Sequence, residues 1–322
     1  MRSHQFKSLV GGLTGLTAKQ LDELRGAVEA QYQRTQALRA LEAAGDGLGC
    51  PHCSSFKFAK NGHSRGLQRY LCTACSQTFN AATNTPLSRL RGKERFFQHG
   101  ECLAQGLSIR ATAAEMGVAV STAFRMRHRF LQEVVSHQPR HVAGLLEADE
   151  TYVREPQKGS RHLTRPARHR GGTAVKAKGR PRDLIPVLVG RLRGQPHVVD
   201  QVLTSMSVLQ ATEALRGACG PDTLLCTDGS GAMRGAAKAL GVTSKSIAVS
   251  YGGRVVEGVY HVQTVNSYHE RLQTWLTRGL RGVATKYLPN YLAWMQVSEW
   301  YRGDLKPEHF VISGLGRQLI NT

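Results

Sequence analysis

The chain lacks any run of about 18 consecutive apolar residues, so we expect neither a membrane-spanning segment nor a membrane partner. In the opening stretch MRSHQFKSLVGGLTGL the apolar portion is too broken to predict a secretory signal. Acidic side chains are also few: 23 aspartates and glutamates stand against 43 lysines and arginines, a net charge of +20. These features predict a soluble, intracellular protein that binds polyanions, nucleic acid being the first candidate and RNA, the ribosome or an anionic membrane surface the alternatives.

Cysteine is scarce as well, but its spacing is informative. Four of the seven cysteines form two CxxC pairs with 18 residues between the pairs: Cys50, Cys53, Cys72 and Cys75. Four thiolates in this arrangement suit one tetrahedral zinc ion, while a redox pair or chance disulfides are the alternatives. We therefore predict a zinc ribbon over residues 49–80 that holds one structural Zn²⁺ and unfolds without it. The solitary Cys219 and Cys226 are expected to pack as small hydrophobic side chains.

Internal repeats are absent, and 322 residues with 41% hydrophobic content allow two or three domains. Before the ribbon, a capping-box sequence at residues 17–20 and spaced leucines predict a helix that ends near Ala44, within an N-terminal helical segment 1–48. After the ribbon we predict three helices, at residues 91–105, 109–116 and 121–135. Gly117 opens the turn between the last two, and Ser121 is expected to cap the third.

This arrangement predicts a helix-turn-helix DNA-binding domain over residues 85–137, with an ordinary helical hairpin as the alternative. Its third helix carries the candidate DNA-binding residues Arg125, Arg127 and Arg129. A second basic segment, residues 154–183, has ten lysines and arginines against two acids and cannot pack in a core. We expect a mobile arm that binds phosphate through residues that include Arg168, Arg170, Lys176 and Lys178.

From residue 141 onward, short apolar runs alternate with helical patterns. This rhythm predicts an α/β domain over residues 141–300 with some antiparallel pairing, followed by a C-terminal tail over residues 301–322. The expected strands are residues 145–153, 184–192, 197–203, 224–227 and 246–249. The expected helices are residues 207–218, 232–240, 266–278 and 286–296.

The first expected strand, LLEADETYV, contains three carboxylates in an otherwise apolar stretch. Side chains alternate along a strand, so Glu147 and Asp149 should share one face while Glu150 projects from the other. A solvated edge strand is the alternative explanation of these acids. Asp228 follows the strand 224–227, at a position where ligands collect in α/β sheets, although Asp-Gly is also a common turn.

A later helix offers further polar groups. Asn266, Glu270 and Gln273 fall at positions i, i+4 and i+7 of one helical face, which is alternatively a solvated stripe. Two aspartates on strands, joined by oxygen ligands from a helix, suit two hard cations that bind a phosphodiester.

The order of these motifs resembles a known family. The zinc ribbon, the helix-turn-helix, EADETYV, the basic insert, CTDGS and YHVQTVNSYHERLQTWLTRGLRGVATKYLPNYLAWM are similar to those of bacterial insertion-sequence transposases with an ISXO-like DDE domain, insertion-sequence family fifteen-ninety-five. The resemblance covers roughly residues 15–297, and its last motif is the most specific. It implies a multidomain protein with an RNase H-like catalytic fold and two Mg²⁺ ions, located in the bacterial cytoplasm and associated with the nucleoid.

The resemblance also implies residue roles. By motif position, Asp149 is the first catalytic residue, Asp228 the second, and Asn266 the third, where the family has glutamate or asparagine. Between Asp228 and Asn266 lie 37 residues, close to the usual spacing of such triads. Charge alone would choose Glu270 as the third metal ligand, but the motif chooses Asn266. We expect Asn266 to bind metal directly and Glu270 to support it.

We therefore expect a transposase that binds the terminal inverted repeats of its element and joins the freed 3′-hydroxyl to target DNA. Its expected partner is double-stranded DNA, on which it forms a homo-oligomer. Gln273 stands where relatives carry a lysine, and Arg271 or Arg278 would have to substitute. This departure keeps open a non-catalytic DNA-binding regulator derived from a decayed transposase. A metal-dependent nuclease without strand transfer is a third alternative.

Overall fold

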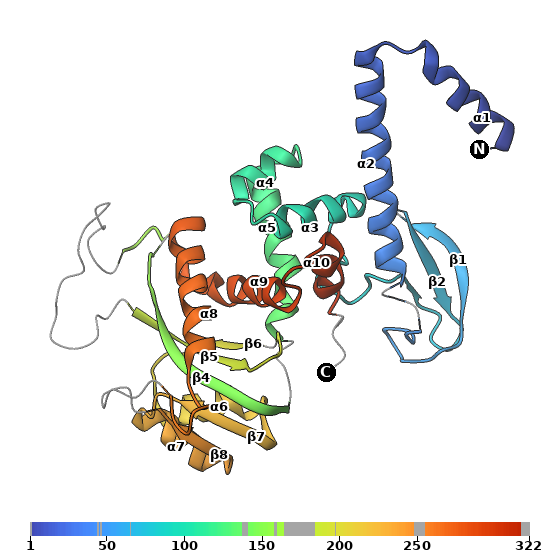
Figure 1. Cartoon of the computed structure of the whole chain (residues 1–322). Helices are drawn as coiled ribbons and strands as arrows, with labels where there is room; N and C mark the ends of the chain where they lie inside the picture. The colour runs from blue at the N-terminus through green and yellow to red at the C-terminus, as the bar shows by residue number, and fades with distance from the viewer. Residues whose placement is uncertain are drawn as a thin grey trace.

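The computed structural model of the chain describes residues 2–316 with internal gaps. Outside the described residues lie Met1, Ala44, Asp46, Arg65, His197 and the segments 137–140, 158–159, 164–183, 248–254 and 317–322. The predicted phosphate-binding residues Arg168, Arg170, Lys176 and Lys178 fall in these gaps. Figure 1 shows two parts in contact, one largely helical with a small sheet and one built on a larger sheet.

Two N-terminal helices, α1 (Ser3–Gly11) and α2 (Ala18–Ala43), project from the rest of the chain (Figure 1). The capping-box prediction is confirmed, because the Gln20 side-chain oxygen accepts hydrogen bonds from the N–H and the hydroxyl of Thr17, both at 2.9 Å. Leu41, near the end of α2, joins the hydrophobic core. No helix among the described residues is long and apolar enough to cross a membrane.

A small antiparallel sheet follows, in the order β1-β2-β3. Its strands are β1 (Phe58–Ser64), β2 (Leu67–Cys72) and β3 (Thr78–Phe79). Phe58, Tyr70 and Phe79 pack their rings with centroids 5.3 to 5.4 Å apart. This aromatic cluster is small, so the sheet depends on other contacts for stability.

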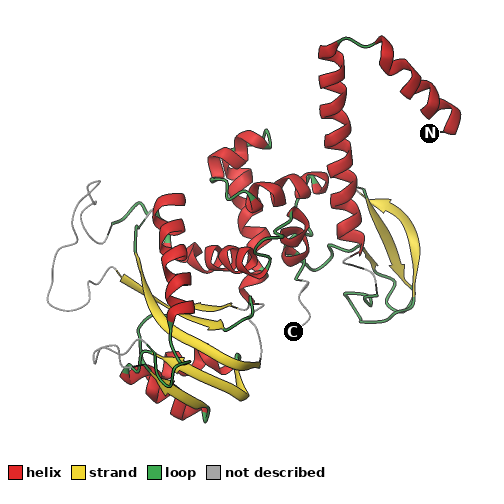
Figure 2. Ribbon diagram, viewed as in Figure 1, coloured by secondary structure: helices red, strands yellow, loops and turns green. Residues whose placement is uncertain are grey.

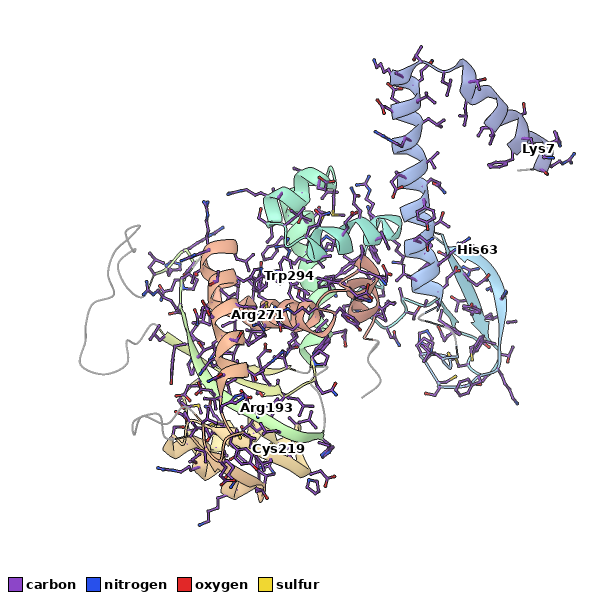
Figure 3. All side chains as sticks on the ribbon, viewed as in Figure 1. Lys7, His63, Arg193, Cys219, Arg271 and Trp294 are labelled. Atoms are coloured by element: carbon purple, nitrogen blue, oxygen red, sulfur yellow. The ribbon has the colours of Figure 1, made fainter. Side chains whose placement is uncertain are left out.

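The helical part packs around Trp294, which is fully buried and donates a hydrogen bond from Nε1 to the Leu103 carbonyl at 3.0 Å (Figure 3). Its helices are α3 (Phe96–Ala104), α4 (Ile109–Glu115), α5 (Val120–Gln132), α9 (Leu288–Trp300) and α10 (Pro307–Gly314). The predicted Ser121 cap is wrong, since α5 begins one residue earlier, after Ala119. The single helix predicted at 91–105 is shorter, because a 3-10 turn precedes Phe96.

The segment predicted only as a C-terminal tail contains α10, which docks onto α3 and α5 through two glycines. A Cβ at Gly100 would collide with the carbonyl oxygen of Pro307, and one at Gly314 would lie 3.2 Å from the Phe130 backbone. These close approaches need residues without side chains. The segment 307–314 is therefore a packed part of the helical core.

The larger sheet has the order β6-β5-β4-β7-β8. Its strands are β4 (Val142–Arg154), β5 (Leu184–Leu192), β6 (Val198–Val202), β7 (Cys219–Thr227) and β8 (Thr243–Ser246). The pairs β4–β5 and β5–β6 are antiparallel, whereas β4–β7 and β7–β8 are parallel. The predicted α/β architecture is confirmed as a mixed sheet, whose central strand β4 carries the acidic motif.

Helices cover both faces of this sheet (Figure 2). The helices α6 (Val208–Arg216) and α7 (Gly231–Leu240) share a core with Leu146 and Ala148 of β4. On the other face, α8 (Gln263–Thr274) continues as a π-helical turn and packs with α9 against β5 and β6. Because side chains alternate along β4, Glu147 and Asp149 project from the face opposite to Leu146 and Ala148, which is the face that α8 covers.

Candidate active site and metal-binding clusters

Asp149 and Asp228 are brought together by the register of two parallel strands. Ala148 of β4 pairs with Thr227, the last residue of β7. Asp149 and Asp228 each come directly after one member of this pair. One carboxylate oxygen from each, together with one from Glu150, lie within 4.8 Å of one another. Asp228 is held in place by a hydrogen bond from the Ser230 N–H to its Oδ1 at 2.9 Å. Two of the sequence-predicted catalytic residues therefore meet.

The presence of Glu150 in this cluster corrects the expectation that it points away from Asp149. Alternation along a strand fixes only the Cα–Cβ direction, whereas the glutamate side chain is long. Since β7 ends at Thr227, no β7 residue pairs with β4 beyond Ala148. The long Glu150 side chain brings a carboxylate oxygen to the other two acids, and the cluster therefore contains three acids.

The neighbouring acids change the proton affinity of Asp149. Burial, together with the neighbouring charges of Asp228 and Glu150, raises the pKa of Asp149 to about 7. Like charges held this close resist simultaneous ionisation unless a cation accompanies them. Oxygen ligands of this kind suit Mg²⁺ or a similar hard cation. The chemistry of the donor set thus fits a divalent metal site.

The start of α8 is fastened to β4 by Glu147, whose side chain is fully buried. Its carboxylate accepts hydrogen bonds from the N–H of Thr264 at 2.8 Å and the N–H of Val265 at 3.2 Å. Arg193 donates to the same carboxylate from Nε at 2.9 Å and to the Val259 carbonyl at 2.6 Å. We call these contacts the Glu147 clamp; its Arg193 is labelled in Figure 3. The clamp explains why a core strand contains a glutamate.

Beyond the Glu147 clamp, later residues of α8 lie opposite later residues of β4. His269 Nδ1 lies 4.0 Å from Oδ2 of Asp149, and Gln273 Nε2 donates to Thr151 Oγ1 at 3.0 Å and to the Tyr152 carbonyl at 2.9 Å. At about 100° per residue, Asn266 lies roughly 20° from Gln273 around the helix axis. Asn266 therefore belongs to the face that looks toward β4.

Glu270 lies farther than Asn266 from the residues that contact β4. It is about 100° from His269 around the helix axis, whereas Asn266 is about 60° from it. Both Asn266 and Glu270 are solvent-exposed. His269 was not predicted from the sequence to lie near the acids. The signal was its spacing, since it follows Asn266 by three residues and therefore lies on the same side of the helix. Burial lowers the pKa of His269 to about 4, so its imidazole is neutral.

The four predicted zinc ligands converge in the small sheet. The sulfur atoms of Cys50 and Cys75 are 3.7 Å apart, those of Cys53 and Cys72 are 3.6 Å apart, and all four lie within 4.8 Å of one another. Tetrahedral zinc with bonds of about 2.3 Å places sulfur atoms about 3.8 Å apart. The group therefore has the dimensions of a single zinc site.

The predicted DNA-binding arginines of α5 divide into two kinds. Arg125 and Arg129 are exposed. Arg127 is a correction, because it is only 1% exposed, donates to the Leu107 carbonyl at 2.6 Å and stacks over the Trp294 ring at 4.6 Å. A guanidinium held in this way is a packing element and is not available to phosphate.

An acidic cluster at the carboxyl end of a parallel strand pair, beside a covering helix, is typical of enzymes that use divalent metal ions on phosphodiesters. Residues 141–297 match the family model of the ISXO2-like transposase domain, so this part of the chain is similar to that transposase family. The match covers the larger sheet and extends through α8 into α9. No curated protein matches the chain.

Among solved structures, similarity extends to an intasome of simian T-cell lymphotropic virus in complex with PP2A regulatory subunit B56 gamma. It has 11% identity and a TM-score of 0.30, and the alignment covers 62% of this chain and 68% of that one. A Mos1 transposase paired-end complex with left transposon end has 12% identity and a TM-score of 0.26, covering 68% and 74% of the two chains. With TM-scores this low, these two likenesses carry no argument, and the similarity that matters for function is the match of residues 141–297 to the transposase domain.

Proposed function

We propose that this chain is an active transposase of an insertion sequence, which hydrolyses phosphodiester bonds at its element's ends and transfers the freed strand to target DNA. The observation that carries the proposal is the meeting of Asp149 and Asp228, set by the β4–β7 register inside the ISXO2-like domain. In the strand order β6-β5-β4-β7-β8, neighbouring strands from β6 to β4 are antiparallel and those from β4 to β8 are parallel. This order supports an RNase H-like assignment of the domain.

The catalytic residues in this proposal are Asp149, Asp228 and Asn266, which would hold two Mg²⁺ ions with Glu270 in a supporting place. Bound there, such ions activate a water or hydroxyl nucleophile and stabilise the leaving oxygen. The chain's own residues prepare the site. Asp149 and Asp228 supply the negative charge, and the Glu147 clamp holds α8 so that its polar face stays opposite them.

The helical part and the small sheet are proposed to bind DNA. We assign residues 49–80 as a zinc ribbon, 85–137 as a helix-turn-helix domain, and 1–48 as a helical extension. Arg125 and Arg129 are exposed on α5 and would contact the terminal inverted repeats. The proposed setting is a homo-oligomer on double-stranded DNA in the bacterial cytoplasm, associated with the nucleoid.

One observation favours a second candidate, a DNA-binding regulator without catalytic activity. Gln273 stands where relatives carry a lysine, and its amide is engaged by Thr151 and by the Tyr152 carbonyl. A neutral side chain tied to the strand supplies no positive charge to a phosphate. A metal-dependent nuclease that cleaves without joining differs from the main proposal only in its product.

The test uses the purified full-length protein with a plasmid that carries the element's ends and Mg²⁺. The proposal expects cleaved and joined products from the natural sequence and none from Asp149→Ala or Asp228→Ala, whose DNA affinity should stay nearly unchanged. Asp222→Ala, which removes an exposed acid from the same strand β7, is the matched control and should keep full activity. DNA binding without any product from the natural sequence would establish the regulator, and cleavage without joining would establish the nuclease.

A further inference from the structure

The His269 imidazole is largely buried beside the acidic cluster. Among the described residues, its Nε2 has no hydrogen-bond partner. Its Nδ1 faces Oδ2 of Asp149 at 4.0 Å, which is beyond hydrogen-bonding distance. The Nδ1 atom and the Asp149 carboxylate oxygen thus face each other without a hydrogen bond between them, and a cation held between the two would satisfy both.

His99 shows what a purely structural buried histidine looks like in the same chain. Both of its ring nitrogens also lack partners, but the ring packs against Phe130 with centroids 4.8 Å apart, in an apolar core. The His269 side chain instead keeps 12% exposure and is directed at the acidic cluster. The two histidines therefore differ in what their nitrogens face.

We propose that His269 is a nitrogen ligand of a divalent ion that Asp149 also binds, with Asn266 one helical turn earlier as an oxygen ligand. The inference rests on the proposed metal-dependent function and adds a residue to it. Two atoms that each bind one ion at about 2.1 Å are at most about 4.2 Å apart. The 4.0 Å separation of His269 Nδ1 and Asp149 Oδ2 is within that limit.

The ligand type has a consequence for the choice of metal. Carboxylates and carbonyl oxygens suit Mg²⁺, whereas imidazole nitrogen favours transition metals along the series that begins with Mn²⁺. Asn266 offers only a neutral oxygen, so the nitrogen of His269 supplies donor strength that the asparagine lacks. The site is expected to prefer Mn²⁺ to Mg²⁺ more strongly than a site built from oxygens alone.

The experiment measures Mn²⁺ bound to the full-length, zinc-loaded protein by electron spin echo envelope modulation, which detects nitrogen nuclei directly bonded to the ion. The natural sequence should show ¹⁴N modulation. His269→Phe, which keeps ring volume without nitrogen, and His269→Ala should lose it. Both should also weaken Mn²⁺ binding, measured by calorimetry, by at least about 10-fold while changing Mg²⁺ affinity less.

The matched control is Asn266→Ala, which removes an oxygen donor from the same helical face and should retain the ¹⁴N modulation. Bound Mn²⁺ without ¹⁴N modulation in the natural protein, or ¹⁴N modulation that persists in His269→Phe, would overturn the role of His269. A different result would contradict the proposed metal-dependent function itself: Asp149→Asn and Asp228→Asn variants that bind Mn²⁺ as tightly as the natural protein does. Circular dichroism of each variant checks that it is folded.

Discussion

The carboxylate of Glu147 accepts a hydrogen bond from the backbone N–H of Thr264 at 2.8 Å, although the two residues lie 117 positions apart in the sequence. Glu147 is two residues before Asp149 on β4, and Thr264 is two residues before Asn266 on α8. One buried carboxylate thus connects the strand that carries the first acid to the helix that carries the third predicted ligand. Because Arg193 neutralises Glu147, the connection is stable in a buried setting.

Glu147→Gln should destabilise the protein by about 3 kcal/mol, since glutamine presents an NH₂ group to donors that need an acceptor and leaves Arg193 without its charge partner. Urea unfolding of the two proteins measures the difference. Glu257→Gln is the control, because Glu257 is exposed and paired with Lys245, and it should change stability by less than about 1 kcal/mol. Equal stability of Glu147→Gln and the natural protein would contradict the clamp.

Metal removal should act on the small sheet first. We expect one zinc per chain, and Cys72→Ser should lose it and unfold β1 to β3, because the aromatic cluster of Phe58, Tyr70 and Phe79 is too small to hold the sheet alone. Elemental analysis and hydrogen exchange of residues 49–80 provide the measurements. Cys219→Ala removes a solitary cysteine of the larger sheet and should keep the zinc. Full zinc content in Cys72→Ser is the result that would refute the site.

Exposed and buried arginines of α5 should behave in opposite ways. Replacing Arg125 and Arg129 together by alanine should weaken DNA binding and reduce the salt dependence of log K by about 2, one unit for each phosphate contact, with little change in stability. Arg127→Ala should instead destabilise the fold by about 3 kcal/mol, because it removes buried hydrogen bonds to Leu107 and Thr112 and a contact with Trp294. Salt titrations of binding and urea unfolding separate the two effects.

The outcome for Arg127 shows what the sequence did and did not reveal. Buried residues of α5 fall at Ala123, Met126, Arg127, Phe130 and Leu131, the i, i+3, i+4, i+7, i+8 stripe of an amphipathic helix. Charge alone predicted a solvent-facing arginine, whereas periodicity would have placed it inside. Basic residues near each other along a helix can therefore have different environments, and the apolar stripe is the better guide.

Strand positions were accessible from the sequence because apolar runs are local. The predicted strand 184–192 is β5 in full. The acids at 149 and 228 were correctly expected to meet: Asp228 follows the end of β7, and Asp149 lies within β4, just after the last residue that pairs with β7. Contacts that depend on tertiary reach were not accessible. The approach of the Glu150 carboxylate to Asp149 and Asp228, the orientation of His269 toward Asp149 and the docking of α10 all require knowing which elements lie opposite.

Stability should depend on pH through Asp200, which is buried and accepts hydrogen bonds from the Tyr268 hydroxyl at 2.7 Å and the Gln296 amide. Burial raises its pKa to about 7, against hydrogen bonds that act in the opposite direction. Between about pH 4 and pH 7 the folded chain keeps a proton that the unfolded chain releases, so the free energy of unfolding falls as pH rises.

Asp200→Asn removes this titration, and its amide oxygen can still accept from Tyr268 while Gln296 rotates its amide. The decline in stability from pH 4 to pH 7 should therefore become shallower by a few kcal/mol, at about 1.4 kcal/mol per pKa unit. Urea unfolding at several pH values gives the slope. Asp222→Asn, at an exposed position, should leave it unchanged. An identical slope for Asp200→Asn would show that Asp200 ionises normally.

We propose Asn266, rather than Glu270, as the third metal ligand. Asn266 lies on the face of α8 that carries His269 and Gln273 toward β4, whereas Glu270 is turned about 100° from His269. Charge favours Glu270, but Asn266 lies closer than Glu270 to the β4-facing residues around the helix, about 60° against 100° from His269 and 20° against 60° from Gln273. Asn266→Ala should therefore reduce cleavage in Mg²⁺ on the order of 100-fold, and Glu270→Ala by about 10-fold or less, as expected for a residue outside direct contact with the metal. Asn266→Asp is the control, since it keeps the oxygen and adds charge, and it should remain active. Loss of activity confined to Glu270→Ala would reverse the order of the two residues.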